Sequence, residues 1–141
     1  MTPEAARFLE KARTLLDHAD VMLGVNLNDE AGRTAYLAGF HAAQAFIYEN
    51  IGKALKTHKG VQMEFLRLTK DDPRFPVDLR VFLSHAYNLK AIADYETGPD
   101  SEVTAERARQ AVQTGKKFVA HVARLLTAPF PSPEGNPGVS T

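Results

Sequence analysis

RTAYLAGFHAAQA, residues 33–45, is the stretch that decides the fold of this 141-residue chain. Small residues recur on several faces of the helix that it would form: Ala35, Ala38, Gly39, Ala42, Ala43 and Ala45. They let neighbouring helices approach closely, while the interleaved aromatic side chains fill the space between the helices. The stretch therefore predicts the central helix of a bundle, beginning near Asp29 and ending between Tyr48 and Gly52.

The flanking segments also show the helical spacing of apolar residues. The predicted helices span residues 3–23, 29–52, 61–68, 77–95 and 101–127. Thr2 is a candidate N-cap for the first helix, and Asp100 or Ser101 for the last. The 77–95 helix is expected to bury Val77, Leu79, Phe82, Leu83, Ala86, Leu89 and Ala93. No segment has the period of a strand, so the predicted fold class is all-α: an antiparallel bundle of four long helices plus one short helix.

The composition is that of one small globular domain. Apolar residues make up 44% of the chain, enough for one core. The 17 Lys and Arg residues balance 17 Asp and Glu residues, so binding of a polyanion has to come from a local patch. The absence of cysteine excludes disulfides and cysteine-ligated zinc. Since no apolar segment suits a signal peptide or a membrane span, we expect a cytoplasmic protein that does not bind membranes.

The chain divides into a predicted domain and a predicted tail. The helices lie within residues 1–128, which we expect to form one helical bundle domain. Residues 129–141 contain four prolines and two glycines, a composition that cannot sustain a helix. We therefore expect a flexible Pro/Gly-rich tail there.

Three motifs follow one another along the chain. The stretch at 33–45 is followed by KTHKGV at 56–61, with Phe65 close behind, and then by KAIADY at 90–95. Together and in this order they resemble the HEPN domain family, in particular a bacterial and archaeal branch with the pattern AYYAxFHAAxA, KTHxGV and RxxADY. The resemblance thus joins the central helix to the segments that follow it.

The resemblance implies a helical bundle that forms a homodimer along its central helices. The residues expected at this interface are Tyr36, Gly39, Phe40 and Ala43. Family members are commonly encoded beside a minimal nucleotidyltransferase, or fused to one, and many such pairs resemble toxin–antitoxin modules. Active members are ribonucleases that use an Arg and a His and need no metal. The resemblance therefore implies a nucleotidyltransferase partner, RNA or a nucleotide as ligand, no metal and no cofactor.

The catalytic motif of the family is altered in this chain. Lys90 occupies its arginine position, Asp94 stands where other branches have the histidine, and Tyr95 follows. Lys cannot copy the bidentate fork with which Arg holds a phosphate, so we interpret the motif as degraded. Lys90 and Asp94 are four residues apart, so an ordinary helical ion pair is the simpler interpretation of them. If a partner modifies this chain, Tyr95 is the hydroxyl to which the resemblance points.

Arg80 and His85 form an alternative catalytic pair. A histidine can transfer protons near neutral pH, and an arginine can hold the phosphate. On a helix, however, two residues five positions apart point about 140° away from each other. The pair also lies upstream of the position at which the family carries its motif.

A basic turn supplies a third candidate site. Lys56, His58 and Lys59 are close enough in sequence to bind a phosphate or a nucleotide. A solvated turn whose pattern reflects the geometry at Gly60 explains the same residues. The five histidines are scattered without paired spacing, so no metal site is predicted. We interpret His41 as a packed residue that is hydrogen-bonded to a neighbouring helix.

Three functions remain open. The first is a dimeric interaction or accessory subunit, paired with a minimal nucleotidyltransferase in a toxin–antitoxin-like module and carrying a degraded ribonuclease motif. The second is a metal-independent endoribonuclease toxin. The third is a nucleotide- or nucleic-acid-binding module that uses the basic turn.

Overall fold

The computed structural model describes residues 1–99 and 101–127, and within them all regular structure is helical. The helices are α1 (Pro3–Gly24), α2 (Asn28–Ile51), α3 (His58–Thr69), α4 (Val77–Arg80), α5 (Phe82–Tyr95) and α6 (Ala105–Thr127). The predicted all-α bundle is confirmed, and the tail predicted at 129–141 lies outside the described residues. Throughout the described ranges, no helix combines the length and apolar character that a membrane crossing requires.

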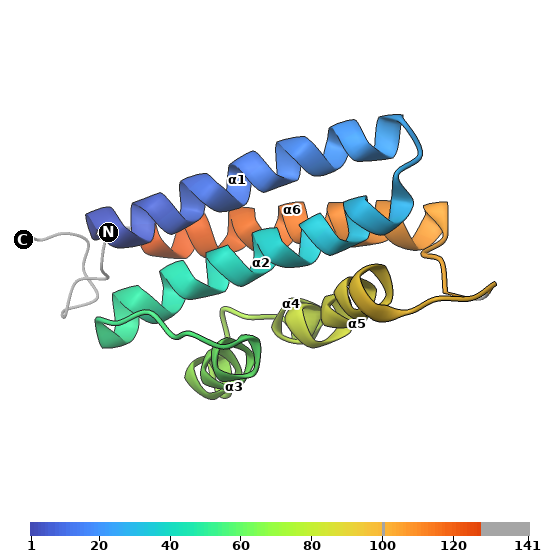
Figure 1. The fold of residues 1–141 in the computed structure, drawn as a ribbon. Coiled ribbons are helices and arrows are strands. Elements are labelled where there is room, and N and C mark those ends of the chain that lie inside the picture. The colour runs from blue at the N-terminus through green and yellow to red at the C-terminus, as the bar shows by residue number, and fades with distance from the viewer. Residues whose placement is uncertain (100, 128–141) are drawn as a thin grey trace, which may run out of the picture.

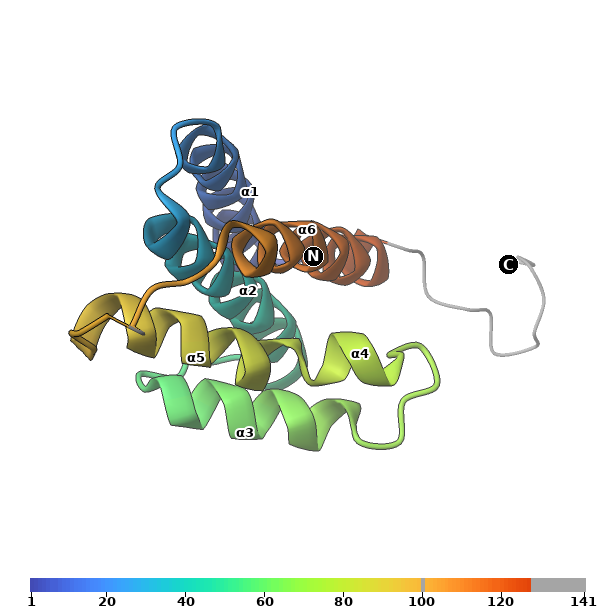
Figure 2. The same ribbon diagram turned by 90° about the vertical axis from the view of Figure 1, so that its right-hand side faces the viewer.

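The helices are arranged around α2. Figure 1 shows α1, α2 and α6 as long helices that run along one another, with α3, α4 and α5 on the opposite side of α2. Figure 2 shows α3 beside α4 and α5. Because α2 contacts α1, α3, α5 and α6, it is the central helix that its small residues predict.

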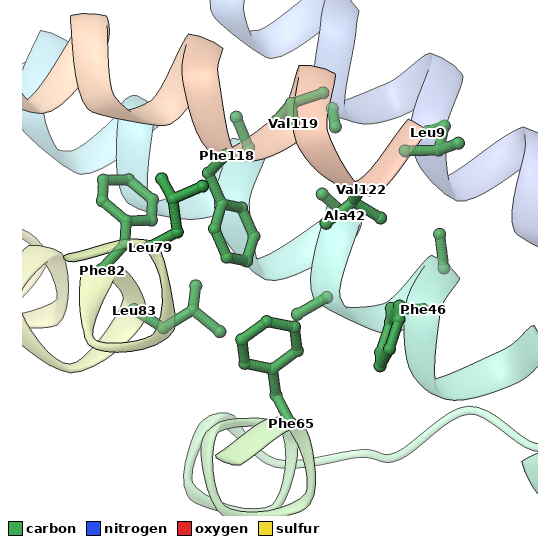
Figure 3. Packing of buried hydrophobic residues seen from close by; sticks show 14 of the residues in the cluster. Leu9, Ala42, Phe46, Phe65, Leu79, Phe82, Leu83, Phe118, Val119 and Val122 are labelled. Carbon is green, nitrogen blue, oxygen red and sulfur yellow. The ribbon is translucent and has the colours of Figure 1, made fainter. Parts of the chain in front are cut away.

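Aromatic side chains fill the space between these helices (Figure 3). Phe46 of α2, Phe65 of α3 and Phe75 pack edge to face, with ring centroids 5.3 to 5.7 Å apart. Phe118 of α6 lies 5.3 Å from both Phe65 and Phe82, again measured between ring centroids. Edge-to-face contacts add stabilisation beyond the burial of apolar area. The aromatic cluster therefore fixes α3 and α5, the two helices that carry the later motifs, against α2.

The small residues of α2 serve contacts within this one chain. A Cβ atom on Gly39 would lie 2.5 Å from Cε2 of Phe82, so only glycine lets α5 come this close. Tyr36 and Ala43 are fully buried, and Phe40 is partly exposed. This corrects the role predicted for Tyr36, Gly39 and Ala43, because the same chain already covers the surface that they were expected to offer a second copy. Dimerisation itself stays a prediction and needs another surface.

The predicted 77–95 helix is interrupted at Val81, which ends α4 and precedes α5. The guanidinium of Arg80 donates to the carbonyl of Leu66 at 2.9 Å and to the hydroxyl of Thr69 at 3.0 Å. These bonds tie α4 to α3, whereas α5 follows a different course against α2. Val77, which was expected to be buried, is the first residue of α4 and is 73% exposed.

The last helix begins later than predicted. The side chain of Thr104 caps it by accepting a hydrogen bond from the backbone N–H of Arg107 at 3.1 Å. Ser101, one of the two predicted caps, instead donates its hydroxyl to the carbonyl of Gly98. The other, Asp100, lies outside the described residues.

Candidate functional site

The three motifs meet where α2, α3 and α5 lie together. The ammonium of Lys90 is 2.6 Å from Oδ2 of Asp94, one turn further along α5. The other carboxylate oxygen of Asp94 accepts a hydrogen bond from Nε of Arg33 on α2, at 2.7 Å. A single carboxylate therefore joins two cations and links two helices that are distant in sequence.

Lys90 is enclosed although it is charged. Its side chain is 9% exposed, and that of Asp94 is 21% exposed. The ammonium lies 5.9 Å from the ring centroid of Tyr87 and 5.3 Å from that of Tyr95, which allows cation–π attraction. The hydrogen bond to Asp94 raises the pKa of Lys90, and the bonds from Lys90 and Arg33 lower the pKa of Asp94. Lys90 and Asp94 are therefore both charged at neutral pH.

His58, on the first turn of α3, lies beside this ion pair. Its Nδ1 is 2.8 Å from the hydroxyl of Tyr36, and the amide of Gln62 donates to the same hydroxyl at 3.2 Å. Among the described residues, Nδ1 of His58 is the one acceptor within hydrogen-bond distance of the Tyr36 hydroxyl, so we assign the hydroxyl as its donor and the ring proton of His58 to Nε2. Burial raises the pKa of Tyr36 to about 12, so the phenol keeps its proton.

The imidazole of His58 is neutral at pH 7. Burial lowers its pKa, the positive charge of Lys90 lowers it further, and Asp94 opposes both effects. Aromatic rings surround it, with ring centroids 4.7 Å away for Phe40 and 5.8 Å away for Tyr87. With its lone pair at Nδ1 already engaged, the neutral ring can donate a hydrogen bond only from Nε2.

The KTHKGV motif owes part of its pattern to the start of α3. The hydroxyl of Thr57 accepts a hydrogen bond from the N–H of Gly60 at 2.9 Å, and a Cβ atom on Gly60 would lie 2.8 Å from that oxygen. Glycine therefore preserves the cap. The three residues of the predicted phosphate site do not act together, because the ring of His58 contacts Tyr36 whereas Lys56 and Lys59 are exposed.

Arg80 and His85 are not brought together. The guanidinium of Arg80 is engaged with α3, whereas His85 lines a cavity between α5 and α6 together with Arg107. The alternative catalytic pair therefore has no shared site in this subunit. In the part of the chain that the structure covers, no three His, Asp or Glu side chains are grouped so as to hold a metal ion.

His41 packs against the rings of Phe8 and Phe40, with centroids 6.3 and 5.5 Å away. The hydrogen bond predicted to a neighbouring helix is not present, because Nδ1 is buried without a partner among the described residues. Burial lowers the pKa of His41, and the positive charge of Lys11 adds to this effect.

Sequence reasoning found Lys90, Asp94 and Tyr95 as one unit and missed the residues that complete it. Arg33 and Gln62 were not identified as site residues, although Arg33 opens the first motif. A signal was present: Arg33 and Asp94 carry opposite charges and belong to two motifs of the same set.

Comparisons with known proteins show the family and the fold of the chain. A family model described as the HEPN domain matches residues 5–125. The structure is similar to the crystal structure of TT1696 from Thermus thermophilus, with a TM-score of 0.72 and 23% sequence identity. That match covers 87% of this chain and 98% of the other, and it shows a shared fold. The search of curated protein sequences gave no match.

Proposed function

Because the chain belongs to the HEPN domain family, we propose that it is a dimeric accessory subunit that pairs with a minimal nucleotidyltransferase in a toxin–antitoxin-like module. In this proposal the ribonuclease motif has become a structural and binding element. The observation that carries the proposal is the sharing of Asp94 by Lys90 and Arg33.

The cations of the motif already have a partner. A ribonuclease needs a positive group that is free to hold the scissile phosphate as charge develops on it. Here a phosphate would have to displace Asp94 from Lys90 and Arg33, and the displaced carboxylate would remain beside it. Two negative groups at such short range repel each other, which favours the ion pair over a bound phosphate.

His58 is poorly placed to act as a general base. A base must accept a proton at a free lone pair within reach of the reacting hydroxyl. In the neutral ring of His58 the lone pair is on Nδ1, where the hydroxyl of Tyr36 donates to it. The remaining ring nitrogen, Nε2, carries a proton and can only donate.

The first experiment asks whether the chain cleaves RNA. The purified protein, incubated with RNA in EDTA, should give the same background level of cleavage as the Lys90→Ala and His58→Ala variants. Cleavage that disappears in both variants would contradict the proposal, because it would show a working site at these residues.

The second experiment tests the pairing. Co-expressed with a minimal nucleotidyltransferase, the chain should purify as a complex, and light scattering should give a dimer for the chain alone. The hydroxyl of Tyr95 belongs to a residue that is 73% exposed, which suits it to accept a nucleotidyl group from a nucleoside triphosphate with release of pyrophosphate. The intact mass should then rise in the wild type and in Tyr87→Phe but not in Tyr95→Phe. A chain that stays monomeric, binds no such partner and keeps its mass would contradict the proposal.

A metal-independent endoribonuclease is the second candidate, and one observation favours it. The neutral ring of His58 lies beside the charges of Lys90 and Asp94, so a histidine and two cations occupy one site. If a bound RNA released the Nδ1 lone pair from Tyr36, this group could move a proton near neutral pH. The EDTA cleavage assay separates the two candidates, since this one requires activity that His58→Ala abolishes.

A further inference from the structure

One face of α6 carries a continuous row of polar and basic side chains. The row consists of Arg107, Gln110, Thr114, Lys117, His121 and Arg124. Spacings of three and four residues keep these positions on the same side of a helix. At a rise of about 1.5 Å per residue, the α6 row is about 25 Å long.

Figure 2 shows α6 next to α4 and α5. The α6 row borders a groove that residues of α4 and α5 line from the other side. The groove consists of two cavities of about 370 and 490 Å³. Arg107, Gln110 and Thr114 line the first, and Lys117, His121 and Arg124 line the second. Asp78 borders both, so the two cavities adjoin and the α6 row follows them from end to end.

The row holds three cations that no carboxylate neutralises. Within residues 1–99 and 101–127, Arg107, Lys117 and Arg124 form no ion pair. Two other basic residues of α6 differ, since Arg109 pairs with Glu106, and Lys116, which also lines the second cavity, pairs with Asp20. The chain has a formal net charge of zero, so the groove is a local concentration of positive charge.

His121 helps to hold Arg124 beside the groove. Its Nε2 donates to the backbone carbonyl of Arg74, which leaves Nδ1 as an acceptor for the guanidinium of Arg124 at 3.3 Å. The guanidinium of Arg74 itself forms an ion pair with Asp72, to which it donates a hydrogen bond at 2.7 Å. Arg124 thus has a defined position without losing its charge.

The floor of the groove offers little apolar surface to a partner. The large side chains beneath it, Leu79, Phe82 and Leu89, are at most 7% exposed. The apolar residues that the lining does expose are small: Pro76 and Ala120 are exposed, and Val81 is partly exposed. A partner protein helix would therefore find little area to bury, and no exposed aromatic ring lines the groove for a base to stack on. What remains is a track of separated positive charges, which matches a chain of phosphates.

We propose that the α6 groove binds the phosphodiester backbone of a single-stranded nucleic acid without reading its sequence. The α6 groove is distinct from the site of Lys90 and Asp94. His85, which lines the groove, and Asp94 are nine positions apart on α5, which places them about 180° apart around its axis. Asp78 is the one carboxylate in the groove lining and opposes binding.

The test is the salt dependence of binding to short labelled homopolymers, followed by fluorescence anisotropy. Three phosphate contacts on a single strand give a slope of log affinity against log salt of about −2, so affinity should fall about 20-fold between roughly 50 and 200 mM salt. Removing two contacts in Arg107→Gln/Lys117→Gln should reduce that fall to about threefold. Asp78→Asn should bind a few-fold more tightly than the wild type, because it removes the opposing charge.

The matched control is Lys11→Gln/Arg109→Gln. It removes an equal amount of positive charge outside the groove, so the slope of log affinity against log salt should stay as steep as in the wild type. RNA and DNA strands should bind alike, since the phosphate is common to both. An equal loss in both double variants, or a slope that neither changes, would overturn the proposal. Tighter binding of a duplex than of a single strand would also overturn the proposal. Polyglutamate that displaces the probe as effectively as RNA does would overturn it too, because the groove would then be assigned to an acidic protein segment.

Discussion

Replacing Asp94 by Asn removes the carboxylate that two cations share while leaving the shape of the side chain nearly unchanged. The ammonium of Lys90 then remains between Tyr87 and Tyr95 with 9% of its side chain exposed and no negative partner. An enclosed charge that loses its partner keeps its desolvation penalty, and the folded state is destabilised by that amount.

The size of the effect follows from the exposure of the two groups. Breaking a fully buried pair by removing one partner costs about 3–5 kcal/mol, whereas an exposed pair contributes about 0.2–1 kcal/mol. Lys90 is nearly buried and Asp94 is 21% exposed, so we expect a loss of about 2 kcal/mol in the free energy of unfolding. In a domain of this size that corresponds to a fall in Tm of about 4–8 °C.

Lys90→Met is the matched variant, because it removes the charge that needs a partner. The methionine keeps an apolar chain between the two tyrosines, and Asp94 retains Arg33. Replacing a buried charge by an apolar group of similar volume is often neutral, so the expected loss is below about 1 kcal/mol. Equal destabilisation by Asp94→Asn and Lys90→Met, measured by urea unfolding at pH 7, would refute this account of the pair.

The pH dependence supplies a second measurement on the same variant. The folded-state pKa of Asp94 is depressed, so its contribution to stability is present above the unfolded value, about 4, and is lost as the pH falls through the folded value. The difference in unfolding free energy between the wild type and Asp94→Asn should therefore be constant near neutral pH and shrink below about pH 4.

Two further predictions concern the interior. Gly39→Ala should lower the unfolding free energy by about 1 kcal/mol, because the cost of overpacking against Phe82 exceeds the gain in helix propensity. In the control Gly24→Ala the added Cβ atom meets nothing within 4 Å, so the unfolding free energy should not fall. Urea unfolding checks both variants through the midpoint, provided that the dependence of the unfolding free energy on urea concentration is unchanged. Burial depresses the pKa of His41 in the folded state, so its contribution to stability is fully present above about pH 6.5 and is lost as the pH falls below that value. His41→Phe should therefore unfold with a weaker pH dependence between about pH 7 and 5 than the wild type, and an unchanged dependence would contradict the role assigned to His41.

The fold was predictable because its main signals are local. The small residues of 33–45 and the apolar stripes of the flanking segments each specify a helix without reference to the rest of the chain. The interruption at Val81 was not predictable in this way, since it accompanies hydrogen bonds from Arg80 to residues of α3 that lie more than ten positions away. Helical spacing across 77–95 is unaffected by such a bond.

The site was predictable only where its residues are neighbours on one helix. Lys90 and Asp94 were identified from the family resemblance, and their spacing predicted the ion pair between them, whereas the contact of Asp94 with Arg33 joins residues 61 positions apart. The role of Tyr36 was missed for a related reason. Small and aromatic residues on α2 indicate that helices pack closely there, but they do not say whether the packed helix belongs to the same chain or to a second copy.

Enclosure of α2 by its own chain determines how the subunit can assemble. Proteins whose hydrophobic core is completed only by a partner subunit have no stable folded monomer, and their separated chains expose apolar surface. In this chain α2, the helix predicted to form the dimer interface, is already covered by other helices of the same chain. Each subunit can therefore fold before it associates with another. In the proposed dimer, association would then be governed by concentration and by the fit of the two surfaces, and a subunit would not have to unfold to exchange its partner.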